Sequence, residues 1–236
     1  MFRPSYFYCL SLFFFLMISN QEGQSEKKQF FFSMGSQDQF VDFMLMRQIS
    51  DKGCGAFIDV APLGPVISNN TFYFEFYHHF KGWIFEANYA HLRKNPMFLA
   101  PNTFQIPFKK LLKDCPDHVD YLSINLGVKN VRLLQILPQR LKFKVITLTC
   151  DFEDCTPYFL EKERLFLEKR GYTCVGKKIK NVLNTSVDHW WVHPDYFNQL
   201  DLKRLKDLSL DELDHFDVMR KIHQEFQDRL DCDHWS

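Results

Sequence analysis

The stretch Ala56-Phe57-Ile58-Asp59-Val60, followed by Ala61-Pro62-Leu63-Gly64-Pro65, decides the fold of this chain. A short run of apolar residues with one polar member is typical of a parallel strand buried on both faces, and the proline and glycine residues after it mark a turn. A second run, Gly82-Trp83-Ile84-Phe85-Glu86, repeats the pattern and has an acid at its C-terminal end. The aromatic residues 70–80 between the runs are compatible with a helix. The chain therefore contains a βαβ unit.

The alternation of strands and helices continues through the middle of the chain. Apolar runs predict further strands, and apolar residues at helical spacing predict further helices. In chain order these are a strand over 119–124, a helix over 130–137, a strand over 143–148, a helix over 157–170, and strands over 172–175 and 189–192. Alternating strands and helices form a mostly parallel sheet covered on both faces, and the last two strands suit an antiparallel hairpin. We therefore expect a Rossmann-like α/β domain over residues 53–200.

The beginning of the chain has the composition of an export signal. Arg3, an apolar run over residues 6–18 and a polar stretch after it follow the order of a secretory signal. The run is shorter than the roughly 20 residues that cross a bilayer, which favours a cleaved signal peptide over a retained anchor. Residues 1–25 are therefore predicted to direct the chain into the secretory pathway, where it would be luminal or secreted; a buried N-terminal helix is the alternative.

Two helical segments are expected outside the central domain. Residues 26–52 are predicted to form a leader segment, because apolar side chains between residues 37 and 50 recur at near-helical spacing. Residues 201–236 are predicted to form an amphipathic tail, in which Ser209 and Glu212 match a capping box ahead of a helix that runs to about Leu230. We interpret the tail as a cover for the domain, with binding to a partner as the alternative.

The charge balance excludes one class of partner. Lys plus Arg and Asp plus Glu each total 29 residues, so the chain has no overall positive field that would draw it onto nucleic acid or an anionic membrane. We expect no nucleic-acid partner, and membrane contact only through the N-terminal segment if it is not cleaved.

Export also changes how the cysteines and two asparagines are interpreted. Outside the signal the chain has six cysteines, an even number that an oxidising lumen could pair in several ways: Cys54, Cys115, Cys150, Cys155, Cys174 and Cys232. Cys150 follows a predicted strand, and we interpret it as a disulfide or buried thiol rather than a nucleophile. Asn69 and Asn184 each begin an Asn-x-Ser/Thr sequon, so both are candidate glycosylation sites in the lumen.

No metal site is predicted. The cysteine spacings are too wide for a zinc motif, and no Cys-x-x-Cys is present. His189 and His193 lie four residues apart on a predicted strand, which separates them by more than about 10 Å at a rise of about 3.3 Å per residue. They are therefore not expected to share a metal ion.

The predicted segments, taken together and in order, resemble the FkbM-type family of S-adenosylmethionine-dependent methyltransferases over residues 54 to about 197. That family has a strand ending in Asp-hydrophobic-Gly-Ala, a Ser-Asn-Thr helix start and a second strand of the form Trp-x-Gly/Ile-x-x-Glu-x-Asn. The matching residues here are Phe57–Val60, Asn69–Thr71, Lys81–Asn88, Asp120–Ile124, Phe143–Thr147, Lys169–Tyr172 and Trp190–Asp195.

The resemblance implies a class I methyltransferase fold and transfer of a methyl group from S-adenosylmethionine to an oxygen, often on a sugar or polyketide. The residues that it places around the cofactor are Asp59, Gly64, Glu86 and Asn88. Glu86, at the end of the second strand, would accept hydrogen bonds from both ribose hydroxyls. The resemblance assigns no catalytic residue.

Three departures from the family pattern fall where the cofactor would bind. The family has glycine at the positions of Ala61 and Pro65, where a bare backbone lets the cofactor approach the strand end. The carboxylates of the family's Asp-x-Glu-Gly-x-Glu signature are replaced in residues 125–130, Asn-Leu-Gly-Val-Lys-Asn. The stretch between Asn88 and Val119 is short for a strand, a helix and an adenine pocket, so one element is expected to be missing or vestigial.

These departures predict a catalytically impaired member of the family that acts as a binding or trafficking protein of the secretory pathway, with an unidentified protein partner or cargo. The alternative is an active O-methyltransferase for a glycan, lipid or small-molecule acceptor, which would use S-adenosylmethionine. A third alternative is a structural luminal domain that is held together by disulfides.

Overall fold

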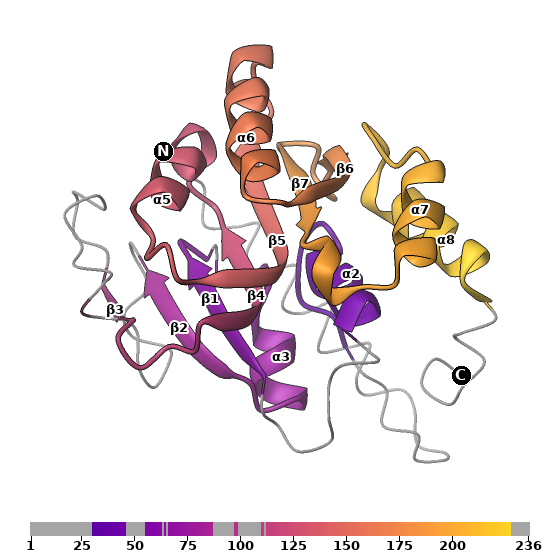
Figure 1. Ribbon diagram of the computed structural model, residues 1–236. Helices are drawn as coiled ribbons and strands as arrows, with labels where there is room; N and C mark the ends of the chain where they lie inside the picture. Colours follow the sequence, from indigo (N-terminus) through magenta and orange to yellow (C-terminus); the bar gives the residue numbers. More distant parts are fainter. Residues whose placement is uncertain are drawn as a thin grey trace, which may run out of the picture.

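The chain folds around a seven-stranded sheet with the strand order β3-β2-β1-β4-β5-β7-β6 (Figure 1). The computed structural model describes residues 30–45, 55–62, 64, 66–86, 97–98, 110 and 112–227. The elements are α2 (Gln37–Leu45), β1 (Ala56–Val60), α3 (Phe72–Tyr77), β2 (Lys81–Glu86), β3 (Met97–Phe98), β4 (His118–Ile124), η2 (Gly127–Lys129), α5 (Asn130–Ile136), β5 (Lys142–Asp151), α6 (Pro157–Lys169), β6 (Thr173–Lys180), β7 (Ser186–Val192), η3 (Pro194–Tyr196), α7 (Gln199–Asp207) and α8 (His215–Glu225).

The strand directions confirm the predicted fold class. Strands β3, β2, β1, β4 and β5 are parallel, whereas β7 runs antiparallel to both β5 and β6. The sheet is therefore Rossmann-like with a C-terminal antiparallel hairpin, as in class I methyltransferases. Of the stretch between Asn88 and Val119, in which one element was expected to be missing or vestigial, the structure describes the two-residue strand β3 and residues 110 and 112–118.

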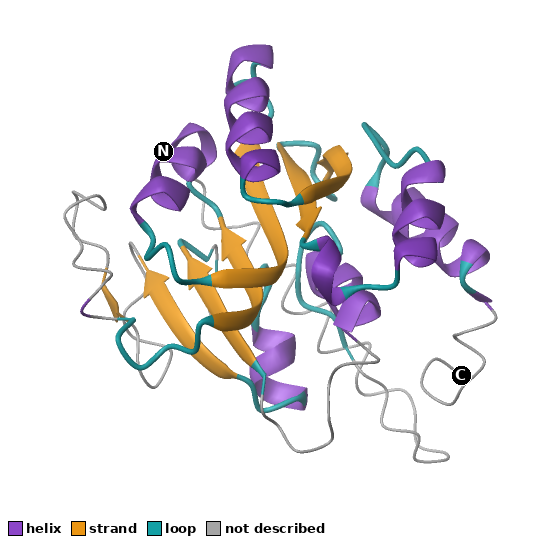
Figure 2. Ribbon diagram, in the orientation of Figure 1, coloured by secondary structure: helices purple, strands orange, loops and turns teal. Residues whose placement is uncertain are grey.

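The two faces of the sheet bury separate hydrophobic cores. Successive strand residues point to opposite faces, and neighbouring residues accordingly enter different cores. Trp190 packs in a core with α2, α3, α7 and α8, while Trp191 packs in another with α5 and α6. Helices cover both faces of the sheet, which explains why its strands are apolar almost throughout (Figure 2).

Helix α2 lies within this fold and is buried nearly all round. Eight of its nine residues are buried, and Phe40, Val41 and Leu45 have no exposed surface. The helix predicted over 37–50 is therefore observed in its first part, but it has no solvent-facing side and joins the core of the domain. Residues 46–54 lie outside the described part of the chain.

The predicted C-terminal helix is observed as α8, but it starts later than the predicted capping box, and a further helix, α7, precedes it. Ser209 and Glu212 lie between the two helices with φ of 51° and 62°. Positive φ is incompatible with a helical turn, so these residues form no capping box. The cap of α8 is instead Asp214, which accepts a hydrogen bond from the backbone N–H of Phe216 at 2.8 Å.

Several predictions fall on residues that the structure does not describe. These are the signal at 1–25 and the residues Cys54, Asn88 and Cys232. They also include residues 89–94, whose sequence is compatible with a helix after the second predicted strand. Among the helices that are described, none has the length and hydropathy needed to span a membrane.

Candidate functional site

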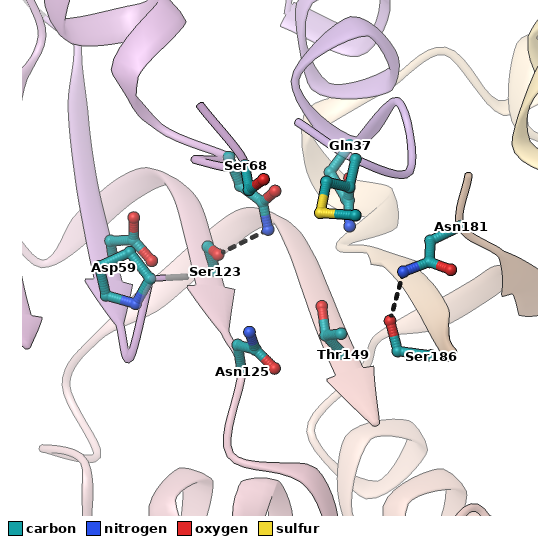
Figure 3. Close-up of a pocket in the computed structure, with 11 residues that line it drawn as sticks. Gln37, Asp59, Ser68, Ser123, Asn125, Thr149, Asn181 and Ser186 are labelled. Atoms are coloured by element: carbon teal, nitrogen blue, oxygen red, sulfur yellow. Dashed lines mark hydrogen bonds between the residues drawn. The ribbon is translucent and has the colours of Figure 1, made fainter. Parts of the chain in front are cut away.

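A pocket lies at the carboxyl ends of the central strands, the edge where ligands bind in open α/β sheets (Figure 3). Strands β1, β4 and β5, the loop after β1, the segment before α2 and the β6–β7 hairpin all contribute to it. Its lining consists of Met34, Gln37, Asp59, Pro62, Ser68, Asn70, Ser123, Asn125, Thr149, Asn181 and Ser186. Most of these side chains are polar and uncharged.

The loop after β1 is held by Asn69 and Asp59. Asn69 is fully buried; its side-chain amide donates to the Gly64 carbonyl at 2.7 Å, and its Oδ1 accepts from the backbone N–H groups of Thr71 and Phe72. The Thr71 hydroxyl in turn donates to the Asp59 carboxylate at 2.7 Å. The sequence Asn-Asn-Thr therefore organises the start of α3 and fixes the position of Asp59.

A hydrogen bond crosses the mouth of the pocket between β4 and the loop after β1. The Asn70 side-chain amide donates to the Ser123 hydroxyl at 3.1 Å. On the far side, the Asn181 amide donates to the Ser186 hydroxyl at 2.8 Å. Both bonds join polar side chains of the pocket lining to each other.

The segment before α2, residues 30–36, covers the pocket. Its backbone is bonded at both sides, because Ser68 N–H donates to the Phe32 carbonyl at 2.8 Å and Val182 N–H donates to the Met34 carbonyl at 3.1 Å. Gln37 then reaches inward and donates to the Asp188 carboxylate at 2.6 Å. The segment thus bridges the loop after β1 and the β6–β7 hairpin.

Asp188 is the buried acid on which this closure rests. It accepts from Gln37 and also from the Thr149 hydroxyl, at 2.5 Å, and it has no exposed surface. Burial raises the pKa of Asp188 to about 6, although both hydrogen bonds act in the opposite direction. Burial likewise raises the pKa of Asp38 to about 6, against hydrogen bonds from Ser33 and nearby backbone groups. The segment before α2 is therefore held by two acids, Asp38 and Asp188, and burial raises the pKa of each to about 6.

The space left in the pocket is too small for S-adenosylmethionine. It measures about 20 Å³, which is room for about one water molecule, whereas pockets for ligands of cofactor size span roughly 300–1,000 Å³. Pro62, Gln37 and the hydrogen-bonded pair Asn70 and Ser123 line the space that remains. As arranged in the structure, the described residues do not fit the cofactor.

The residues that the resemblance placed around the cofactor have different outcomes. Asp59 lies in the pocket. Gly64 stands in the loop after β1, where an added Cβ would lie 2.4 Å from the Ile67 carbonyl oxygen, so its glycine is required by the loop itself. Glu86 ends β2, and its side chain is not among the described ones, while Asn88 lies outside the described residues.

Ala61 retains one property of the glycine that the family has at this position. Its φ is 58°, in the left-handed region that glycine adopts without strain. Its N–H donates to the Phe85 carbonyl at 2.8 Å, which ties the turn after β1 to β2. The turn therefore keeps its backbone path although the residue has changed.

The two sequons lie in different surroundings. Asn69 is buried, and its amide nitrogen is already bonded to Gly64, so the folded chain leaves no room for a glycan there, contrary to the prediction. Asn184 is exposed in the β6–β7 turn with φ of 52°. It remains a candidate acceptor.

Four of the six cysteines outside the predicted signal lie in the described part of the chain. Cys115, Cys150, Cys155 and Cys174 are free thiols in the structure, so no disulfide joins these four. In the described part of the chain, no cluster of three or more potential ligands could hold a metal ion.

Sequence reasoning missed the residues that close the pocket. Gln37 and Asp188 are 151 positions apart and meet only because α2 packs against β7. The signal that the sequence offers is an acid, Asp188, next to the apolar strand predicted over 189–192.

The fold and the position of the pocket define this chain as a methyltransferase-like Rossmann domain. No protein-family model matches the sequence, and no curated protein matches it. Among solved structures, the chain is similar to the METTL16 MTase domain, with a TM-score of 0.42 and 11% identity over 68% of this chain and 66% of that one. The chain thus spans slightly less than two thirds of that structure, and we draw no functional conclusion from the similarity.

Proposed function

We propose that this chain is a methyltransferase-like protein without S-adenosylmethionine turnover, which acts in the secretory pathway by binding a protein partner or cargo. The observation that carries the proposal is the closed pocket at the carboxyl edge of the sheet, with about 20 Å³ of space. A methyltransferase needs at this edge a cavity that admits the whole cofactor.

The closure depends on buried groups, which distinguishes it from a surface loop resting on an open site. Gln37, Asp188 and Thr149 are joined by short hydrogen bonds in the interior. Opening the pocket would remove the Gln37 donor from the Asp188 carboxylate, whereas Thr149, on the neighbouring strand, would stay. A buried group that loses a hydrogen bond in this way costs about 1–3 kcal/mol. The closed form is therefore favoured by the chain's own interactions.

The alternative is an active O-methyltransferase for a glycan, lipid or small-molecule acceptor. The position of Asp59 in the pocket favours it, as does an acid, Glu86, at the end of β2. It requires the segment before α2 to move away when the cofactor binds.

Calorimetric titration of S-adenosylmethionine into the purified full chain separates the two. We expect no saturable heat from a sample that melts cooperatively. Saturable binding in the micromolar range that is lost in Asp59→Asn would contradict the proposal and support the methyltransferase. The exposed substitution Asp217→Asn serves as the control variant, since Asp217 lies on α8, outside the pocket lining.

A further inference from the structure

A second group of chemically active side chains lies on the face of the sheet opposite the pocket, beneath α6. Thr149 and Asp188 point to the pocket side of β5 and β7, so their neighbours Cys150 and His189 point to the α6 side. Cys155 lies in the loop between β5 and α6, next to this pair. The four strand residues thus contribute to two separate polar sites.

The side chains in this group are connected in series. The Cys155 Sγ lies 3.4 Å from His189 Nε2, and His189 Nδ1 lies 2.7 Å from the Glu163 carboxylate. The same Glu163 oxygen accepts from the Trp191 indole N–H at 2.9 Å. Cys150 and Cys155 belong to the same small cluster of buried side chains. A thiol, an imidazole and a carboxylate are therefore connected, with a second thiol beside the first.

Burial does not leave these groups neutral. Burial by itself lowers the pKa of His189, but the charge of Glu163 and the bonds to Cys155 and Glu163 raise it to about 10. The neighbouring Cys150 and His189 lower the pKa of Cys155, although burial acts against this. The neighbouring Cys155 raises the pKa of Cys150. These directions favour a thiolate at Cys155 beside an imidazolium at His189, with the proton kept on Cys150.

Cys155 is the less buried of the two thiols and lies beside exposed residues. It is 7% exposed, against 1% for Cys150, and it directly precedes Thr156, the N-cap of the 13-residue helix α6. The loop residues before it, 151–154, are exposed. A helix N-terminus further favours a thiolate, and a low-pKa thiolate near the surface is the form of cysteine that reacts with disulfides.

We propose that Cys155 is a nucleophile that exchanges with low-molecular-weight disulfides, with Cys150 as the resolving thiol and His189 and Glu163 as positioning residues. The chain would thus carry a dithiol–disulfide site that is independent of the pocket and of the function proposed for it.

The reaction proceeds in two exchanges. The Cys155 thiolate attacks one sulfur of the small disulfide, whose S–S bond breaks, and the departing thiolate takes the proton of the His189 imidazolium. Cys150 then gives its proton to the neutral His189, and its thiolate attacks the Cys155 sulfur and releases the second small molecule as a thiolate, which takes that proton. Two protein thiols are oxidised to one disulfide, and one small disulfide is reduced to two thiols.

The first test is alkylation of the reduced full chain by iodoacetamide between pH 5.5 and 9, followed by trypsin digestion and mass spectrometry. Cys150 and Cys155 share the peptide 145–162, in which fragmentation separates them, whereas Cys174 lies in the peptide 171–177. Cys174 is the internal control, because it is more exposed than Cys155 while burial raises its pKa to about 12. We expect Cys155 to react at least about tenfold faster than Cys174 at pH 6.

His189→Gln should move the pH dependence of Cys155 alkylation upward, toward that of an ordinary thiol, while His193→Gln, at the end of the same strand, should not. The wild-type profile tests the proposal even if the His189 variant does not fold. Faster alkylation of Cys174 than of Cys155 at pH 6 would overturn it.

The second test is incubation of the full chain with oxidised glutathione. We expect the peptide 145–162 to lose two hydrogens, reversibly with dithiothreitol, and Cys150→Ser to retain glutathione on Cys155. If the variant retains no glutathione, or the wild-type peptide gains no disulfide, the proposal is wrong. Neither test involves S-adenosylmethionine, so the result is independent of the function proposed for the pocket.

Discussion

The ring of Phe40 on α2 stacks on the ring of Trp190 on β7, with centroids 4.2 Å apart and planes 18° apart. Both side chains are fully buried. The contact joins α2, near the start of the described chain, to β7. Gln37 lies one helical turn before Phe40, and the contact holds it over Asp188. Closure of the pocket is therefore part of the packing of the hydrophobic core.

Phe40→Ala should destabilise the chain strongly. It removes a buried ring and its stacking partner's contact, for which we expect a loss of about 3–5 kcal/mol in the free energy of unfolding. Phe152→Ala, at a ring that is 56% exposed, should change it by no more than about 0.5 kcal/mol. Urea unfolding followed by circular dichroism measures both. Equal midpoints for the two variants would contradict the role of the stack.

Asp188→Asn should change how stability depends on pH. The folded-state pKa of Asp188, about 6, lies above the ordinary value of 3.8, so the folded chain binds the extra proton between these values. The contribution of Asp188 to stability is then greatest below about pH 4 and is lost as the pH rises through 6. The wild-type free energy of unfolding, minus that of the variant, should fall by roughly 2–3 kcal/mol between pH 4 and 6.5. A constant or rising difference in urea titrations would refute this assignment.

Gly64→Ala should be more damaging than Gly127→Ala. At Gly64 the new methyl group would lie 2.4 Å from the backbone oxygen of Ile67, which cannot move as a side chain can. Gly127 has φ of +57° but open space around it, so alanine there costs only backbone strain of about 1 kcal/mol. We expect a loss of about 2–3 kcal/mol for Gly64→Ala in thermal or urea unfolding. A smaller effect at Gly64 than at Gly127 would show that the loop can rearrange.

Asn184→Gln should remove the glycan that the chain acquires if it is exported from a eukaryotic cell. Asn184 is exposed, whereas Asn69 is buried and bonded to Gly64. Glycosidase treatment should therefore shift the electrophoretic mobility of the wild type but not of Asn184→Gln, and Asn69→Gln should keep the shift. Absence of any shift in the wild type would count against passage through the secretory pathway.

The strands could be predicted from the sequence because burial on both faces requires continuous apolar runs, as in residues 56–60 and 143–148. The helices at the C-terminus could not, because the turn at Ser209 and Glu212 has the same residue types as a capping box. Its positive φ values arise where the chain crosses β6: Glu212 N–H donates to the Lys177 carbonyl and Lys180 N–H to the Leu213 carbonyl. Such nonlocal bonds leave no periodic pattern in the sequence.

The residues of the candidate sites could likewise be predicted from the sequence only in part. Asp59 was predictable because an acid at the end of a buried strand lies at the ligand-binding edge by topology alone. The partners Gln37 and Asp188, and likewise Cys155 and His189, are distant in the chain and meet through packing. The residue types alone do not place these side chains in shared sites, because only the packing of the folded chain brings them together.

The sequence by itself determined a doubly covered α/β sheet and the edge at which a ligand would bind, because hydrophobic periodicity and turn residues are local properties of the chain. Only the tertiary structure decided that this edge is closed and that a second reactive site lies beneath α6. Both depend on contacts between segments that are far apart in sequence, and the distance and direction of such contacts are set by how the helices pack on the sheet.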